Sequence, residues 1–386
     1  MSALPHEAYV AALASLEGVG PARLRWLLSG GTPAEVYAAV REGRLRDAPS
    51  EVRVDAGLRE AWRDGAARLD PAALWERCGR LGIGVVTIGS AAYPPALRDD
   101  PDPPVVLFHR GDPDVLAGPR VAVIGTRRAT GYGIRVAERF GRELAEAGVS
   151  VVSGLALGID AAAHRGATSV AGAPPVAVVG GGLDDPCPVR NRALAEAVAE
   201  RGVVLSEVPP GVAAAPWRFP VRNRILAALG EVVVVVESAR AGGSMHTVRE
   251  ALARDRPVLA VPGPIDARAS EGTNLLLVEG AHPCTSVDDV LVALGRAPLP
   301  HRGGDARPAE QVDPRPLPEG DAEAVLGALE WRPSTAEQLA ARTGLDFRRL
   351  SVALGWLESH GWVRRDGGWV ERVAGSPIRG GDGSRA

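Results

Sequence analysis

Short runs of consecutive apolar residues, rich in valine, recur between residues 121 and 261 and alternate with stretches in which apolar residues fall every three or four positions. Runs that are apolar at every position are typical of parallel strands buried on both faces, and the intervening spacing is typical of amphipathic helices. The pattern therefore predicts an α/β fold with a doubly wound, mostly parallel sheet. The predicted strands are Val121–Ile124, Val149–Val152, Val176–Val179, Val203–Leu205, Val232–Val236 and Val258–Val261, with Leu275–Leu277 as a weaker candidate.

The two ends of the chain follow different patterns. The first part shows helical periodicity and contains Leu16–Arg23, which is similar to a helix-hairpin-helix turn that contacts phosphate, although a simple packing turn is the favoured interpretation. Frequent prolines after residue 296 predict a linker, and three helical patterns with a hairpin near Gly367 and Gly368 then predict a winged helix. The predicted divisions are helices in 1–85, the sheet core in 86–297, the linker in 298–319, the winged helix in 320–373 and a disordered tail in 374–386.

The composition of the chain excludes only a few classes of protein. The longest apolar run is far shorter than the roughly 20 residues of a membrane helix, and the start of the chain lacks a secretory pattern, so we expect a cytoplasmic protein without membrane contact. The three cysteines lie far apart in no metal-binding spacing, and we expect neither a metal nor a cofactor. Because the net charge is −3, any nucleic-acid site must be a local cluster of arginines.

In an open parallel sheet, ligands bind beyond the carboxyl ends of the strands, so the residues directly after each strand carry the candidate chemistry. Four such residues, Gly125, Thr126, Arg127 and Arg128, stand where a dinucleotide-binding enzyme would carry GxGxxG. The missing glycine and the added arginines indicate an anion site for a phosphodiester. Backbone N–H groups, the dipole of the following helix and a guanidinium would form it.

The second strand is followed by another group of polar candidates. Ser153 and Gly154 are predicted to form a second phosphate cradle. Asp160 suits a helix N-cap better than a catalytic acid, since aspartate satisfies the free N–H groups of a first turn. His164 suits a packing role better than that of a base.

The segment before a later helix gives the most specific local signal, because three arginines and an aromatic ring lie within seven residues. The candidates are Arg218, Phe219, Arg222, Asn223 and Arg224. Unpaired bases stack on aromatic rings while neighbouring arginines bind phosphates, and each stacked base contributes roughly 1–3 kcal/mol. The alternative is that Phe219 packs in the core and one arginine forms an ion pair with Glu207.

Two further turns complete the set of candidates. Arg190 and Asn191 follow a glycine-rich turn after the third strand, and Gly243, Ser244 and Thr247 open a helix after the fifth. Ser244 lacks both the GxSxG elbow and an evident acid partner, which disfavours a hydrolase.

Together these motifs resemble the DprA/Smf family of bacterial DNA processing proteins over nearly the whole chain. The matching stretches are Tyr93–Leu97, Pro103–Phe108, the Gly-Thr-Arg turn at 125–127, Ser153–Asp160, Phe219–Arg224 and Val261–Gly263. The resemblance implies a SAM-like helical N-terminal domain, an extended Rossmann-like core that binds single-stranded DNA and dimerises, and a C-terminal winged helix. It also implies that the protein protects incoming DNA and loads the recombinase RecA on it during natural transformation.

The chain departs from the family pattern at three places. Cys187 and Pro188 stand where Tyr-Pro is usual, and Ala241–Thr247 replaces Ser-Gly-Ser-x-x-Thr. A lysine that often precedes the Phe-Pro motif is absent, and Arg218 is taken as its substitute.

Two enzyme classes remain as alternatives. Gly242, Gly243, Thr247 and Glu250 faintly resemble the PGGxGTxxE motif of nucleotide phosphoribohydrolases of the lysine decarboxylase-like family, without its proline and with longer spacing. An NAD-dependent oxidoreductase would require the GxGxxG motif that the chain lacks.

The sequence therefore predicts a non-catalytic protein that binds single-stranded DNA. The predicted DNA-binding residues are Gly125, Thr126, Arg127, Arg128, Ser153, Gly154, Arg190, Asn191, Arg218, Phe219, Arg222, Asn223, Arg224, Gly243, Ser244 and Thr247. The expected partners are RecA, a second copy bound through the apolar segment Val287–Leu294, and single-strand-binding protein as a further candidate. Residues 319–373, which include the winged helix, contain seven arginines and nine acidic residues, and this domain is not expected to be the principal DNA site.

Overall fold

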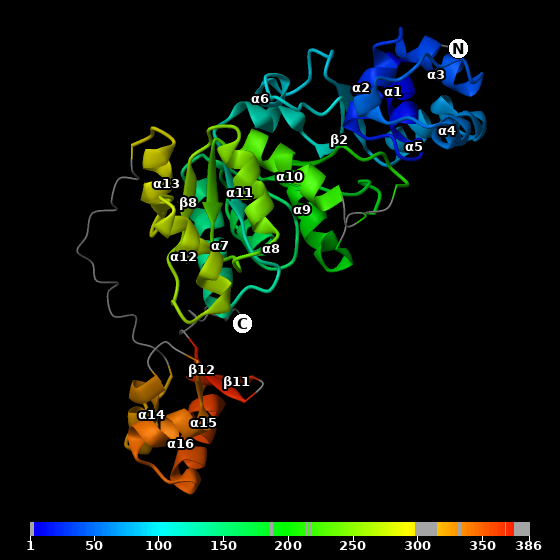
Figure 1. The fold of residues 1–386 in the computed structure, drawn as a ribbon. Helices are drawn as coiled ribbons and strands as arrows, with labels where there is room; N and C mark the ends of the chain where they lie inside the picture. Colours follow the sequence, from blue (N-terminus) through cyan, green and yellow to red (C-terminus); the bar gives the residue numbers. More distant parts are fainter. Residues whose placement is uncertain are drawn as a thin grey trace, which may run out of the picture. The chain divides into compact units, whose positions relative to one another are not determined.

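The structure is a computed structural model that describes residues 4–185, 188–212, 215, 218–297, 315–329, 333–366 and 368–373, with the backbone alone at Asp366. The described chain forms two compact units, 1–300 and 301–386 (Figure 1). Cys187, Gly367, the predicted tail and residues 298–314 of the predicted linker lie outside the described residues.

The first unit is built on a nine-stranded sheet with the order β1-β2-β6-β5-β4-β3-β7-β8-β9. Strands β3 to β9 pair in parallel, whereas β2 pairs antiparallel to both β1 and β6. The fold is therefore the predicted Rossmann-like, mostly parallel sheet. The strands are β1 Gly84–Thr87, β2 Val106–Gly111, β3 Arg120–Ile124, β4 Ser150–Ser153, β5 Val176–Val179, β6 Val203–Ser206, β7 Val232–Val235, β8 Val258–Ala260 and β9 His282–Pro283.

The weaker strand candidate was wrong. Leu275–Leu277 lies in helix α12, Glu271–Val278, with Leu276 buried and the residues on either side of it only partly buried. Three consecutive apolar residues fit a short helix as well as a strand, because so short a run has no period. The strand that ends the sheet is β9, which is exposed and therefore gives no hydrophobic signal.

Helices cover both faces of the sheet, and alternate strand residues face opposite layers. Val121 and Val123 of β3 pack with α7, α8 and α13, whereas Ala122 and Ile124 pack with α10, α11 and α12. The helices of the sheet region are α6 Pro95–Arg98, α7 Gly131–Glu146, α8 Ile159–Thr168, α9 Arg192–Arg201, α10 Arg218–Leu229, α11 Ser244–Leu252, α12 Glu271–Val278 and α13 Val287–Ala293.

Helices α7 and α8 approach each other closely because glycines lie between them. A Cβ atom added at Gly141 would lie 2.0 Å from the carbonyl oxygen of Ala163, and one at Gly166 would lie 2.0 Å from that of Glu138. Only glycine fits at either position without a shift of the partner helix.

Five N-terminal helices belong to the same compact unit as the sheet and lie together beside β2 (Figure 1). Their apolar residues share one hydrophobic cluster with residues of β2, β5 and β6. In the turn that is similar to a helix-hairpin-helix motif, the Arg23 guanidinium donates hydrogen bonds to the carbonyl oxygens of Gly18, Val52 and Arg53. The helices are α1 His6–Ala14, α2 Pro21–Leu28, α3 Pro33–Arg41, α4 Ala56–Arg68 and α5 Pro71–Arg80.

The second unit is a winged helix with its own hydrophobic cluster around Leu339, Leu350 and Leu357. Its three strands pair in the order β10-β12-β11. Its elements are α14 Asp321–Leu329, β10 Ser334–Thr335, α15 Ala336–Thr343, α16 Phe347–Ser359, β11 Val363–Asp366 and β12 Trp369–Arg372. In the described part of the chain, no helix is long and apolar enough to cross a membrane.

Candidate nucleic-acid interface

A groove of about 560 Å³ lies at the carboxyl edge of the sheet, where the turn after β3 meets the N-terminal ends of α10 and α11. It brings together ten of the predicted residues, which are Gly125, Thr126, Arg127, Arg128, Phe219, Arg222, Asn223, Gly243, Ser244 and Thr247. Ile124, Ala156, Asp160, Pro220, Leu226 and His246 also line the groove and were not predicted as contacts. The apolar ones carried no signal, because strand and helix residues of this kind are normally core.

An exposed arginine and an aromatic ring form one side of the groove. The Arg127 guanidinium carbon lies 4.7 Å from the centroid of the Phe219 ring, which is partly buried. The ring holds the arginine by a cation–π contact and leaves its N–H donors available to a ligand. Arg128 is exposed beside it, so two positive charges lie at the groove.

Arg222 lies in the floor of this groove rather than at its surface. Its side chain is buried and donates hydrogen bonds to the carbonyl oxygens of Gly154 and Val178. Burial lowers the pKa of Arg222 to about 10, while the nearby Asp160 carboxylate acts in the opposite direction. The prediction that this guanidinium faces a phosphate is therefore corrected, because it is used to hold two strand ends together.

Asp160 does not cap its helix, contrary to the prediction. Gly158 occupies the N-cap position of α8 with φ 81°, and Asp160 lies within the first turn. Its carboxylate accepts a hydrogen bond from the Gly154 N–H at 3.1 Å. Burial raises the pKa of Asp160, and the Arg222 charge opposes that shift.

The predicted second phosphate cradle is closed. The Ser153 hydroxyl is fully buried and donates to the Val123 carbonyl oxygen at 2.6 Å, and the Gly154 N–H is taken by Asp160. A Cβ at Gly154 would lie within 2.7 Å of both Asp160 and Arg222, so the glycine is required by packing.

Four other predicted residues also lie outside the groove lining. Arg224 is buried, and its Nη2 donates to both carboxylate oxygens of Glu207 at 2.7 and 2.8 Å, which is the alternative that the sequence left open for one arginine. Asn191 is buried and donates to the Leu155 carbonyl oxygen at 2.8 Å, while Arg190 beside it is exposed. Arg218 is partly buried at the start of α10 and lines a small cavity against α2.

The N-terminus of α7 is filled by the protein's own carboxylate. Glu237, buried directly after β7, accepts hydrogen bonds from the Thr130 N–H at 2.9 Å and the Thr130 hydroxyl at 2.6 Å. A Cβ at Gly133 would lie 2.3 Å from this carboxylate. The predicted use of this helix dipole for an external phosphate is thus corrected, because an anion already occupies the position. An acidic residue immediately after a neighbouring strand was the only sequence signal for it.

The N-terminus of α11 lacks a side-chain cap. Gly243 is its N-cap, gives no side-chain cap and is exposed, and the first turn contains no acidic residue. Gly243 and Ser244 line the groove, so the positive end of this helix dipole lies beside it. The Ser244 hydroxyl is hydrogen-bonded to that of Ser238 at 2.8 Å, and Thr247 is buried.

Comparison with known proteins identifies the family. The family model for DNA recombination-mediator protein A matches residues 84–295, which include every residue of the groove, and the DprA winged helix domain model matches residues 307–369. The chain belongs to the DprA/Smf family. A putative DNA processing protein DprA of Mycobacterium tuberculosis is 41% identical over 271 residues, which cover 69% of this chain and 68% of that protein.

Two solved structures of DprA proteins resemble this one. The X-ray structure of DprA from Streptococcus pneumoniae aligns with a TM-score of 0.61 and 31% identity, covering 76% of this chain and 98% of that chain. A structure of Helicobacter pylori DNA processing protein A, described for its unique single-stranded DNA binding mode, aligns with a TM-score of 0.50 and 31% identity over 55% of this chain and 95% of that one.

Proposed function

We propose that this DprA/Smf protein is a non-catalytic binder of single-stranded DNA that holds an unpaired nucleotide in the groove after β3. The observation that carries the proposal is the exposed Arg127 held over the Phe219 ring, in the same groove as the N-terminus of α11. The described binding of single-stranded DNA by the Helicobacter pylori relative supports the same activity here.

The groove offers separate contacts for the base and the phosphate. Phe219 and the Arg127 guanidinium plane form a stacking surface for a base, a contact that contributes roughly 1–3 kcal/mol. Arg128 and the α11 N-terminus supply positive charge for a phosphodiester. A groove of about 560 Å³ has room for one unpaired nucleotide.

The enzyme alternatives find less support in this site. The carboxylate of Glu237 stands at the helix N-terminus where a dinucleotide's pyrophosphate would bind. The Ser244 hydroxyl is paired with Ser238 rather than with a base. No contact in the groove favours a phosphoribohydrolase over a DNA-binding protein.

We propose that the bound strand is protected and passed to RecA during recombination, including natural transformation, and that the protein acts as a homodimer, with single-strand-binding protein as a further partner. The recombination-mediator family supports the first step. In α13, Val292 is 61% exposed and supports a dimer contact, whereas Val287, Val290 and Leu291 are buried against the sheet region. The proposed modules are residues 1–85, 86–297 and 320–373. Residues 298–319 link the second module to the third.

Fluorescence anisotropy with a labelled oligothymidylate and a blunt duplex of equal length, at several salt concentrations, tests the binding proposal. We expect a clear preference for the single strand and an affinity that falls by roughly 0.7 log units per phosphate contact for each log unit of salt. Equal affinity for the duplex would contradict the proposal.

A further inference from the structure

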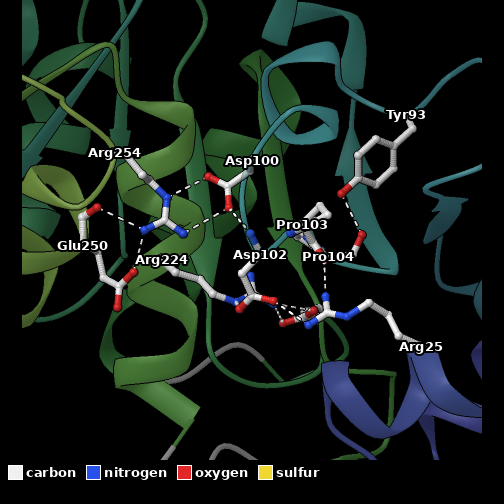
Figure 2. Close-up of polar contacts among 10 residues, drawn as sticks. Arg25, Tyr93, Asp100, Asp102, Pro103, Pro104, Arg224, Glu250 and Arg254 are labelled. Atoms are coloured by element: carbon white, nitrogen blue, oxygen red, sulfur yellow. Dashed lines mark hydrogen bonds and ion pairs between the residues drawn. The ribbon is translucent and has the colours of Figure 1, made fainter.

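The segment between α6 and β2, residues 99–104, carries two acidic residues whose partners come from distant parts of the chain (Figure 2). Asp100 is almost fully buried and accepts hydrogen bonds from the Arg254 Nε and Nη2 atoms at 2.7 and 3.0 Å. Arg254 also donates to the carboxylate of Glu250 at 2.6 Å. Asp100 thus fixes the end of α11 that lies farthest from the groove.

Asp102, two residues further on, joins two other elements. It accepts from Arg25 of α2 at 2.6 Å and forms an ion pair with Arg224 Nε of α10 at 2.9 Å. A second hydrogen bond, from Arg25 to the Pro103 carbonyl oxygen, is 3.0 Å long. The segment is therefore bonded to both helices whose N-terminal ends line the groove, and to the N-terminal helices as well (Figure 2).

The N-terminal region and α10 also line the same small cavity. Gly20, Pro21 and Leu24 of the N-terminal region and Val221 and Ile225 of α10 line a cavity of only about 50 Å³. A shift of α2 would therefore act on α10 through Asp102, which pairs with Arg25 of α2 and with Arg224 of α10. Arg224 lies five residues after Phe219 on that helix, so the ring would move with it.

We propose that residues 99–104 position α10 and α11 around the groove, and that the Arg25–Asp102 ion pair makes this position depend on the N-terminal helices. The inference rests on the proposed function, since its readout is single-stranded DNA bound in the groove. Arg25 and Asp102 are 41% and 42% exposed, and pairs exposed to this degree contribute little free energy. The coupling should consequently tune affinity by a few fold rather than switch it on or off.

Arg25→Ala in the full-length protein tests the inference, with labelled oligothymidylate and anisotropy as the readout. We expect affinity to fall about three- to fivefold, with the unfolding midpoint and the salt dependence unchanged, because Arg25 lies outside the groove lining. Arg25→Lys should restore part of the affinity, since lysine can still pair with Asp102. The matched control is Arg63→Ala, which removes the same charge from exposed Arg63 of α4 and should change affinity by less than twofold.

A double variant separates positioning from other roles. If Arg25 acts through the position of Phe219, then Arg25→Ala should have no further effect in a Phe219→Ala background. Equal affinities of Arg25→Ala and Arg63→Ala for the oligothymidylate would overturn the inference. A salt slope of Arg25→Ala smaller than that of the parent by about 0.7 would also overturn it, because that change would indicate a direct phosphate contact. If Phe219→Ala and Arg127→Ala both bind like the parent, the proposed function fails instead, whatever Arg25 does.

Discussion

Arg127 and Arg224 are the same residue type in the same region, yet the structure uses them in different ways. Arg127 is exposed over an aromatic ring, whereas Arg224 is 6% exposed and paired with Glu207 and Asp102. Sequence spacing cannot separate these cases, because both arginines lie in arginine-rich stretches between predicted strands. What distinguishes them is whether a carboxylate from another element reaches the guanidinium.

Alanine substitution should therefore affect different properties at these two positions. Arg127→Ala should weaken binding of single-stranded DNA about tenfold, by roughly 1–2 kcal/mol, with an unchanged unfolding midpoint. Arg224→Ala should instead lower the free energy of unfolding by about 3 kcal/mol, since it leaves Glu207 buried without its partner. Titration with DNA and urea unfolding check both, with Arg142→Ala, at an exposed position of α7, as the control. A stable Arg224→Ala protein that has lost DNA binding would reverse the assignment.

His164 gives the fold a dependence on pH. It is completely buried in α8, and burial lowers its pKa to about 4, helped by the Arg222 charge. The folded state therefore binds fewer protons than the unfolded state between about pH 4 and the ordinary histidine value near 6.5. Stability from this group is present above pH 6.5 and is lost as the pH falls toward 4.

Urea unfolding at pH 7.5 and pH 5 measures this effect. We expect the parent to lose about 2 kcal/mol more than a His164→Leu variant over this interval, after which the difference should approach about 3 kcal/mol near pH 4. Asp160 and Glu207, whose pKa values burial raises, are present in both proteins and cancel in the comparison. If the free energies of unfolding of the parent and of His164→Leu change with pH in the same way, His164 does not titrate as stated.

At the scale of elements, the sequence predicts the parallel centre of the sheet and misses its edges. Strands such as β7 are buried at every residue and stand out as valine runs. In contrast, β9 is exposed and β1 is mostly only partly buried, so neither has that pattern. The turn after β3 and the helix beginning at Arg218 were also predictable as parts of the site. The Glu237 carboxylate at α7 was not, since it depends on how β3 and β7 lie side by side.

The contact between α7 and α8 gives a prediction at this scale. Gly166→Ala should lower the free energy of unfolding by about 1–3 kcal/mol, because the added methyl group would overlap the Glu138 carbonyl oxygen and force the helices apart. Gly79→Ala in α5 is the matched control, since a Cβ there meets nothing within 4 Å. We expect that variant to be neutral or slightly more stable. Equal unfolding curves for the two would show that the helices can separate without cost.

At the scale of the whole molecule, arginines of the winged helix differ from the exposed Arg127 of the groove, because they are paired with carboxylates. Arg349 pairs with Asp321, Arg364 with Glu371 and Arg365 with Glu358 inside the domain. Helix α16 exposes apolar side chains as well, with Phe347 at 75% and Val352 at 69%. Guanidinium groups already paired with carboxylates contribute less to phosphate binding, which favours a contact with protein over one with DNA.

Truncation after Ala297 tests this division of roles. The shortened protein should bind single-stranded DNA within about threefold of the full chain, or under roughly 1 kcal/mol, and should still sediment as a dimer. A loss of tenfold or more in a folded, dimeric truncation would place a DNA contact in the removed part. A sedimentation mass of one chain at micromolar concentration, in the full-length protein, would remove the dimer proposal.

The carboxylate of Glu237 at the start of α7 also bears on selectivity inside a cell, where free nucleotides far outnumber exposed DNA strands. Related sheets bind the pyrophosphate of such nucleotides at this helix end. Here the position is already neutralised by a buried side chain, so ATP or NAD would have to displace Glu237 from Thr130. If the groove binds DNA as proposed, a pyrophosphate-bearing metabolite that entered the groove would find no second anchoring point at this helix end.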